Sequence, residues 1–216
     1  MTSSLSARDS VVHLLRHGEV HNPNRILYGR IPGYGLSELG AAMAQAAADA
    51  LADRPVSYLA CSPLQRAQET AIPVAAALGL DVATDERLIE PTNVFEGRPF
   101  GVGDGSLLRP GSWRHLYDPF TPSWGEPYRA IAQRMAKVIA AARQRAGGGE
   151  AVLVTHQLPI VTARRAAEGR PLWHHPNRRM CGLASLTSFH YCGDNLVAIR
   201  YIEPAGAVSR LPGKGA

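Results

Sequence analysis

Short apolar segments alternate with helical segments along this chain of 216 residues, and the alternation constrains its fold more than any other feature. Strands buried on both faces of a parallel sheet are short, nearly continuous runs of apolar residues. Six segments have this content or the pattern of an antiparallel strand: Val11–Arg16, Val56–Cys61, Val82–Thr84, Ala151–Thr155, Ala184–Tyr191 and Leu196–Ile202. Because helices separate most of them, the chain is expected to form an α/β fold, a three-layer α/β/α sandwich with a mostly parallel sheet. The last two segments are predicted to form an antiparallel pair.

Four helices are predicted from composition and end signals. The expected ranges are Ser37–Asp53, Ser62–Leu78, Pro127–Ala146 and Pro159–Glu168. Ser37 and Ser62 stand where N-cap residues would. Pro63 at the first helical position and Gln65 three residues after Ser62 complete a strong helix start. The run Gly147–Gly149 is predicted to end the third helix.

The segment from Pro91 to Glu126 has neither helical nor strand periodicity. It is rich in proline and glycine and contains two of the three tryptophans. Irregular segments of this length are usually lids, binding loops or small subdomains, so residues 91–126 are predicted to be an inserted lid, with a purely structural excursion as the alternative. The rest is predicted to be one domain, residues 11–203, between a flexible N-terminus (1–10) and a flexible tail (204–216).

The chain carries a moderate positive charge that arginine supplies almost alone. Lys and Arg number 23 against 18 Asp and Glu, a formal net charge of +5, and 21 of the cations are Arg. Arginine grips phosphate or carboxylate through two parallel N–H donors. Nucleic acid is not expected as a partner, because there is no long basic run and the aromatic residues do not interleave with cations.

Cysteine use and hydropathy predict a reducing, cytoplasmic location. The three cysteines are widely spaced and form no Cys-x-x-Cys pair, so neither a disulfide framework nor a cysteine zinc site is expected. No apolar run approaches the ~18 residues of a membrane helix, and the first ten residues lack the apolar region of a signal peptide. No membrane association is therefore expected, and the sequence leaves a monomer and a homodimer open.

Three of the predicted strands deliver polar groups suited to phosphoryl chemistry. The first ends at Arg16 and His17, the second leads to Arg66 in the first turn of a helix, and the fourth ends at His156. The carboxyl ends of parallel strands share one edge of the sheet, where open α/β folds bind ligands. A neutral histidine can attack phosphorus, while arginines and a helix N-terminus stabilise phosphoryl oxygens. The sequence therefore predicts a phosphoryl-transfer site at this edge.

A series of motifs resembles those of the histidine phosphatase superfamily, which includes the cofactor-dependent phosphoglycerate mutases. They occur in the family's order and cover nearly the whole predicted domain. The motifs are LRHGE at 15–19, LSELG at 36–40, SPLQRAQET at 62–70, LIE at 88–90 with FEG at 95–97, GEP at 125–127 and VTH at 154–156.

The resemblance implies a role for each matching residue. His17 is expected to attack phosphorus and become phosphohistidine. Arg16, Arg66 and His156 are expected to bind the phosphoryl oxygens and stabilise the charge of the transition state. Glu90 is expected to protonate the leaving oxygen and then to activate water. No metal or other cofactor is implied, because the arginine and histidine cluster supplies the positive charge.

Three departures from the family pattern bear on candidate site residues. Asn22 stands one residue before the usual asparagine position, which is Pro23 here, so it is either a phosphate ligand or an ordinary turn residue. Gln157 replaces the usual glycine after the second histidine and is predicted to contact phosphate or substrate. Glu90 is one residue closer to the Phe-Glu-Gly segment than in many relatives, which makes Glu96 the rival acid.

Two histidine patterns are not interpreted as ligand-binding sites of their own. His13, His17 and His21 have a spacing that would form a metal-binding face on a helix, but the predicted strand breaks that geometry. The segment His174–Arg179 follows the last helix in a loop and is interpreted as solvated rather than as part of the site.

Together these features predict a histidine acid phosphatase-type enzyme. It would be a metal-independent phosphomonoester hydrolase that acts through phosphohistidine on a small phosphorylated metabolite. A cofactor-dependent phosphoglycerate mutase is the first alternative, and it is disfavoured because mutases of the family carry a longer insertion after the acid. A non-catalytic phospholigand-binding module is the second, and the retained histidines and arginines argue against it. The sequence does not determine the natural substrate.

Overall fold

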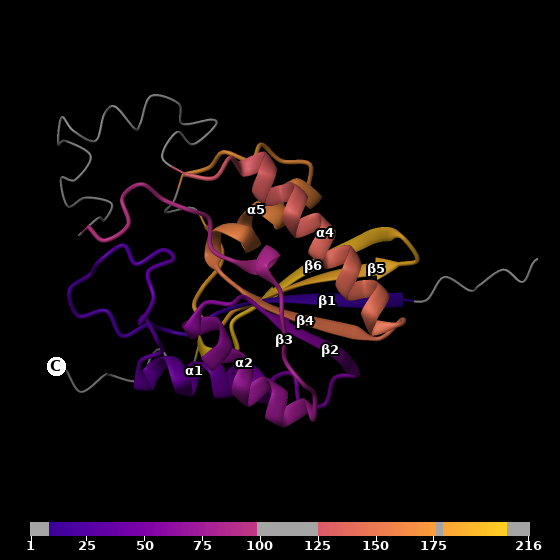
Figure 1. Ribbon diagram of the computed structural model, residues 1–216. Coiled ribbons are helices and arrows are strands. Elements are labelled where there is room, and N and C mark those ends of the chain that lie inside the picture. The colour runs from indigo at the N-terminus through magenta and orange to yellow at the C-terminus, as the bar shows by residue number, and fades with distance from the viewer. Residues whose placement is uncertain (1–8, 99–124, 176–178, 207–216) are drawn as a thin grey trace, which may run out of the picture.

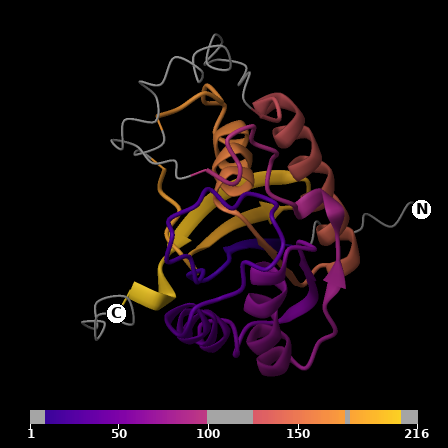
Figure 2. The same ribbon diagram turned by 60° about the vertical axis from the view of Figure 1, so that its left-hand side comes forward.

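The computed structural model describes residues 9–98, 125–175 and 179–206. They form a six-stranded sheet between two pairs of helices (Figures 1 and 2). In chain order the elements are β1 (Asp9–Arg16), α1 (Glu38–Asp49), β2 (Val56–Cys61), α2 (Gln65–Leu78), β3 (Ala83–Thr84), the 3-10 turn η1 (Glu86–Leu88), α4 (Tyr128–Ala146), β4 (Glu150–Thr155), α5 (Gln157–Ala167), β5 (Leu186–Cys192), β6 (Asn195–Ile202) and the 3-10 turn η4 (Pro204–Gly206). The three-layer α/β/α architecture is therefore confirmed.

The strand order places the ends of three neighbouring parallel strands together. The order is β3-β2-β4-β1-β5-β6, in which the first four strands are parallel and β5 and β6 are antiparallel to their neighbours. Arg16 of β1 lies opposite Thr155 of β4, and Cys61 of β2 lies opposite Val154. The mostly parallel sheet and its closing antiparallel pair are as predicted.

The central strands are apolar because both of their faces are covered. In Figure 1, α4 and α5 lie above the sheet and α1 and α2 below it. Leu14 and Leu153 belong to the core beneath α4 and α5, whereas the next residues along each strand, Leu15 and Val154, belong to the core on the α1 and α2 side. This alternation explains why β1 and β4 are buried along almost their whole length.

Two predicted helix starts are wrong, and both lie beside the candidate site. The helix α2 begins at Gln65, and its N-cap position is Leu64 rather than Ser62. The Ser62 hydroxyl instead lies 2.8 Å from the Nε2 atom of His156. The helix α5 begins at Gln157, two residues before Pro159, so that His156 itself occupies the N-cap position. Neither start has a side-chain cap hydrogen bond among the described residues, and both lie next to residues of the candidate site.

The other helix ends follow the sequence signals more closely. The Ser37 hydroxyl accepts the Gly40 amide at 3.0 Å, as expected of the N-cap of α1, but this helix ends at Asp49 instead of continuing to Asp53. Gly147 ends α4 in the left-handed conformation, with φ at 60°, which glycine adopts without steric cost.

The folded part of the chain is longer at both ends than predicted. The strand β1 begins at Asp9, which pairs with Cys192 of β5, so residues 9 and 10 are not part of a flexible N-terminus. The 3-10 turn η4 lies against α1 and buries Ala205, so the tail does not begin at residue 204. Strand pairing holds the first extension and packing against α1 holds the second. Neither contact has a local sequence signal.

Most of the predicted lid, residues 99–124, lies outside the described residues, so the lid remains a prediction. The two described ends of the segment are joined by an antiparallel bridge between Asn93 and Gly125. Among the described helices, none has the length and apolar content to cross a bilayer.

Candidate active site

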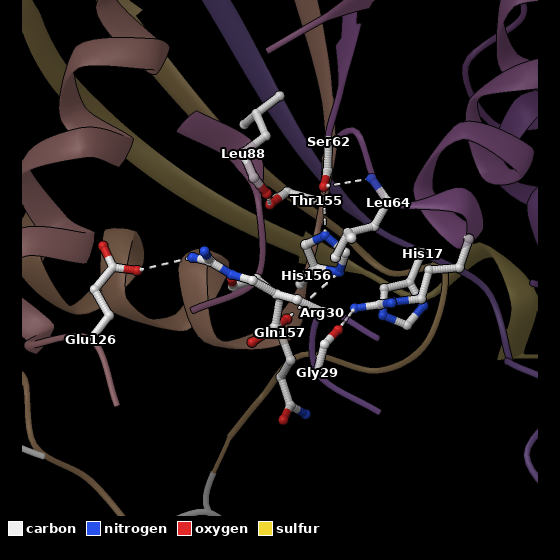
Figure 3. A network of polar contacts seen from close by, with 12 residues as sticks. His17, Gly29, Arg30, Ser62, Leu64, Leu88, Glu126, Thr155, His156 and Gln157 are labelled. Carbon is white, nitrogen blue, oxygen red and sulfur yellow. Dashed lines mark hydrogen bonds and ion pairs between the residues drawn. The ribbon is translucent and has the colours of Figure 1, made fainter. Parts of the chain in front are cut away.

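The structure brings His17 and His156 together at the carboxyl edge of the sheet. They follow the neighbouring strands β1 and β4, the His17 amide donates to the Thr155 carbonyl at 3.1 Å, and the two ring centroids are 5.2 Å apart (Figure 3). Both side chains are almost fully buried. Arg66 lies in the first turn of α2 and is also buried, at 1% exposure. The convergence that the strand ends predict is therefore present.

The hydrogen bond of His17 fixes which ring nitrogen carries the proton. Its Nδ1 lies 2.8 Å from the Gly18 carbonyl oxygen, which can only accept, so Nδ1 is protonated and Nε2 keeps its lone pair. Burial lowers the pKa of His17 well below its usual value, and the positive charges of Arg66 and Arg16 lower it further. The ring is therefore neutral at pH 7, which is the state that a nitrogen nucleophile requires.

The two arginines of the site are oriented by backbone carbonyls rather than by carboxylates. Arg16 Nη1 donates to the Cys181 carbonyl at 2.7 Å, and Arg66 Nη2 donates to the Gly29 carbonyl at 2.8 Å. The Arg66 guanidinium also lies 4.7 Å from the centroid of the Tyr28 ring. The buried Nε of each arginine has no hydrogen-bond partner among the described residues. Because an unsatisfied buried donor is costly, both positions favour the binding of an anion.

Ser62 is hydrogen-bonded to His156. The Leu64 amide donates to the Ser62 oxygen at 3.4 Å, and the Ser62 hydroxyl lies 2.8 Å from Nε2 of His156, to which it can donate its proton. Nδ1 of His156, which carries the ring proton when Ser62 donates, is buried without a hydrogen-bond partner in the described part of the chain. Burial lowers the pKa of His156, as does His17, so this ring is also neutral. His156 thus presents a third N–H group beside those of Arg16 and Arg66.

Glu90 lies next to His156 without being hydrogen-bonded to it. Its Oε2 atom is 3.6 Å from Nδ1 of His156, which is too long for a hydrogen bond, and its side chain is 21% exposed. Burial raises the pKa of Glu90, against the opposing effect of Arg66 and Arg16. A carboxyl group with a raised pKa can hold a proton to donate, which is what an acid catalyst needs.

Two arginines that the sequence analysis did not select hold the backbone near Glu90. Arg30 Nε donates to the Glu90 carbonyl at 2.5 Å, and Arg134 Nη1 donates to the Arg87 carbonyl at 2.5 Å. Glu126 links them, since it accepts from Arg134 Nε at 2.9 Å and lies 3.9 Å from Arg30 Nη2. Figure 3 shows the pair of Glu126 and Arg30. The segment that carries Glu90 is therefore attached to α4 and to the loop after β1.

Comparison with known proteins identifies the family. The model of the histidine phosphatase superfamily, branch 1, matches residues 12–203, which is nearly the whole folded domain. The chain is a histidine phosphatase superfamily member.

Relatives of the chain include proteins of different stated function. The uncharacterized protein Rv0525 of Mycobacterium tuberculosis is 56% identical, with 91% of this chain and 98% of that protein covered. The mycobacterial glucosyl-3-phosphoglycerate phosphatase Rv2419c has a similar structure, with a TM-score of 0.70 and 29% identity over 90% of this chain and 97% of that one. The probable phosphoglycerate mutase GpmB of Yersinia pestis is 29% identical over 93% of this chain and 94% of that protein. The family thus includes both phosphatases and a probable mutase.

Glu96 and Asn22 form hydrogen bonds within their own loops rather than with the histidine and arginine residues of the candidate site. Glu96 Oε1 accepts the Asn93 amide at 3.2 Å, so this carboxylate is bonded within its own turn. Asn22 donates to the Ile26 carbonyl at 2.8 Å and accepts the Ile26 amide at 3.0 Å. Both ends of the Asn22 amide are therefore used to close a loop, and its role as a phosphate ligand stays a prediction.

Gln157 and Arg179 lie together beside the histidine pair. Gln157 donates to the Cys181 carbonyl at 3.3 Å and accepts from Arg179 Nη1 at 3.3 Å. Arg179 Nε also donates to Nε2 of His174 at 3.0 Å. The interpretation of this loop as solvated is wrong for His174 and Arg179, which are half-buried and bonded, while residues 176–178 lie outside the described residues.

Several contacts of the candidate site carry no sequence signal of their own. Tyr28 and Gly29, which receive Arg66, lie in an irregular loop with no recognisable period. Ser62 belongs to a recognised motif, but its pattern predicts a helix cap rather than the contact with His156. Within the described residues, no three His, Cys, Asp or Glu side chains are grouped as metal ligands, and His13 instead bonds Ser188 and Glu150.

Proposed function

We propose that this histidine phosphatase is a metal-independent phosphomonoester hydrolase that transfers the phosphoryl group of a small cytoplasmic metabolite to His17 and then to water. The observation that supports it most is the neutral His17 ring with its lone pair on Nε2, next to buried N–H groups on Arg16, Arg66 and His156 that have no hydrogen-bond partner among the described residues. A nucleophile beside these three unpartnered buried donors is suited to a phosphoryl group.

In the first step, Nε2 of His17 attacks phosphorus, an N–P bond forms and the bond to the leaving oxygen breaks. The protonated carboxyl of Glu90 transfers its proton to that oxygen, so an alcohol leaves and Glu90 becomes a carboxylate. Arg16, Arg66 and His156 donate to the other phosphoryl oxygens as their charge increases. Glu90 is favoured over Glu96 for this role because it lies 3.6 Å from His156, whereas Glu96 is bonded in its own turn.

In the second step, the Glu90 carboxylate takes a proton from water while the water oxygen attacks phosphorus. The N–P bond breaks, inorganic phosphate forms and His17 returns to its neutral state. The pKa of Glu90, raised by burial, suits a group that gains and loses a proton in each cycle. The arginines, together with the N-termini of α2 and α5, supply the positive charge that a metal ion provides in other phosphatases.

The test compares hydrolysis with isomerisation. Purified protein should release phosphate from p-nitrophenyl phosphate, at a rate unchanged by a metal chelator, and His17→Ala should abolish the release. The relationship to GpmB makes a mutase the alternative, so 3-phosphoglycerate with a bisphosphoglycerate primer is tested in parallel. Isomerisation faster than phosphate release would establish the mutase instead, and phosphate binding without either reaction would indicate a non-catalytic module.

A further inference from the structure

We propose that Arg179 is a second anion-binding position beside the phosphoryl site. It would give the enzyme a preference for phosphomonoesters whose leaving alcohol carries another negative charge, a carboxylate or a second phosphate. The inference rests on the proposed hydrolase function and narrows its substrate class.

Arg179 differs from two ion-paired arginines of the molecule in the chemistry of its partners. Arg134 and Arg54 are each held by two hydrogen bonds to a carboxylate, Glu126 and Glu150 respectively. These pairs are complete without a ligand, because each cation already has its counter-ion.

Arg16, Arg66 and Arg179 instead have neutral hydrogen-bond partners among the described residues. Arg16 and Arg66 donate to backbone carbonyls, and Arg179 donates to the Gln157 amide oxygen and to the His174 ring. A half-buried guanidinium that lacks a contacting carboxylate is costly, and an anionic ligand group would remove that cost. Arg179 thus belongs with the two phosphate-binding arginines rather than with the structural ones.

The neighbours of Arg179 hold its guanidinium in place. His174 Nδ1 donates to the Leu172 carbonyl at 2.7 Å, so its Nε2 can accept from Arg179 Nε. The His174 ring lies 5.6 Å from the Tyr128 ring, centroid to centroid, at the start of α4. A cation that is already positioned loses less conformational entropy when a ligand binds.

Arg179 is joined to the phosphoryl site through Gln157. Gln157 directly follows His156, accepts from Arg179 and donates to the Cys181 carbonyl oxygen, which also accepts from Arg16. The donors of Arg16, Arg66 and His156 that lack a partner among the described residues are the ones proposed to hold the transferred phosphoryl group. An anion on the leaving alcohol is therefore the expected partner of Arg179.

The experiment measures kcat/KM for phosphate release from two matched pairs of substrates. Glycerol 3-phosphate is compared with 3-phosphoglycerate for the carboxylate, and fructose 6-phosphate with fructose 1,6-bisphosphate for the second phosphate. We expect the wild-type enzyme to favour the more charged member of at least one pair by about tenfold or more, an ordinary effect for a charged hydrogen bond. The pair that shows the preference identifies the anion.

Variants then assign the preference to Arg179. Arg179→Gln should reduce it about tenfold, and Arg179→Lys, which keeps the charge but loses the planar fork, should retain part of it. Arg170→Gln is the matched control, since Arg170 is exposed, pairs with Glu168 and carries the same charge. A thermal melt of each variant verifies folding.

Hydrolysis of p-nitrophenyl phosphate separates the two proposals. If that substrate is hydrolysed but both members of each pair react equally well, the second anion position is refuted and the hydrolase stands. An equal loss on all substrates in Arg179→Gln also refutes it, because that result assigns Arg179 to general positioning. If no phosphoester is hydrolysed, the hydrolase proposal fails and this inference fails with it.

Discussion

Glu150, far from the candidate site at the start of β4, allows a quantitative prediction of acid stability. Its carboxylate accepts from Arg54 Nη2 at 2.5 Å and Nε at 2.6 Å, and lies 2.9 Å from Nε2 of His13. The side chain is only 10% exposed. The hydrogen bonds from His13 and Arg54 overcome the effect of burial and lower the pKa of Glu150 from 4.5 to about 2.

A lowered carboxyl pKa stabilises the folded state above the unfolded pKa, and the stabilisation is lost as the pH falls through the folded pKa. For Glu150 it is complete above about pH 4.5 and declines between there and about pH 2. At ~1.4 kcal/mol for each pH unit, the interval corresponds to about 3–4 kcal/mol in the free energy of unfolding. Loss of this carboxylate should therefore destabilise the protein at neutral pH by an amount of that order.

The assay is urea unfolding of the wild type and Glu150→Gln in steps from about pH 7 to about pH 3. The difference in the free energy of unfolding should be largest at neutral pH and shrink as the pH falls below about 4.5. Glu86→Gln is the control, because Glu86 is exposed and has no ion pair in the described structure, and it should show little difference. A destabilisation by Glu150→Gln that stays constant over the whole range would refute the reasoning.

Three further predictions concern the site. Ser62→Ala should lower kcat about tenfold, because His156 loses its hydrogen bond to the Ser62 hydroxyl. Ser57→Ala, which loses a hydrogen bond to the Ala146 carbonyl at the opposite end of the sheet, is the control and should keep the wild-type kcat. Equal kcat values for the two variants would contradict the role of Ser62. Glu90→Gln should slow esters with poor leaving groups by ~10²–10⁴ and p-nitrophenyl phosphate less, and the same pattern in Glu96→Gln would identify the other acid. Hydrolysis of esters with poor leaving groups should persist as the pH falls through 6.5, because the lowered pKa of His17 keeps its ring neutral. The rate should decline as the pH rises through the raised pKa of Glu90, because the acid loses its proton. A pH–rate profile with the opposite slopes would contradict both assignments.

The sequence predicted the centre of the site because that part depends on strand geometry. Apolar runs that stop at Arg16 and at Thr155 identify buried parallel strands, and parallel strands bring their carboxyl ends to one edge. In the structure, Arg16 pairs with Thr155, so the carboxyl ends of β1 and β4 lie side by side. The convergence of His17 and His156 follows directly from it.

The sequence failed where tertiary contacts override local signals. Ser62 has the pattern of an N-cap, yet its hydroxyl bonds His156, and α2 begins three residues later. Arg179 lies in a loop without periodicity, and only the folded chain shows that Gln157 and His174 hold it. Contacts between residues distant in the sequence are invisible to propensity and patterning.

The most direct test of the account is to trap the phosphorylated enzyme. Rapid quenching at alkaline pH during turnover, followed by peptide mass spectrometry, should find one phosphoryl group on the ring of His17 and none in His17→Ala. The label should disappear on acidification, as expected of a phosphorus–nitrogen bond. Phosphate on another residue, or turnover by His17→Ala at the wild-type rate, would contradict the account.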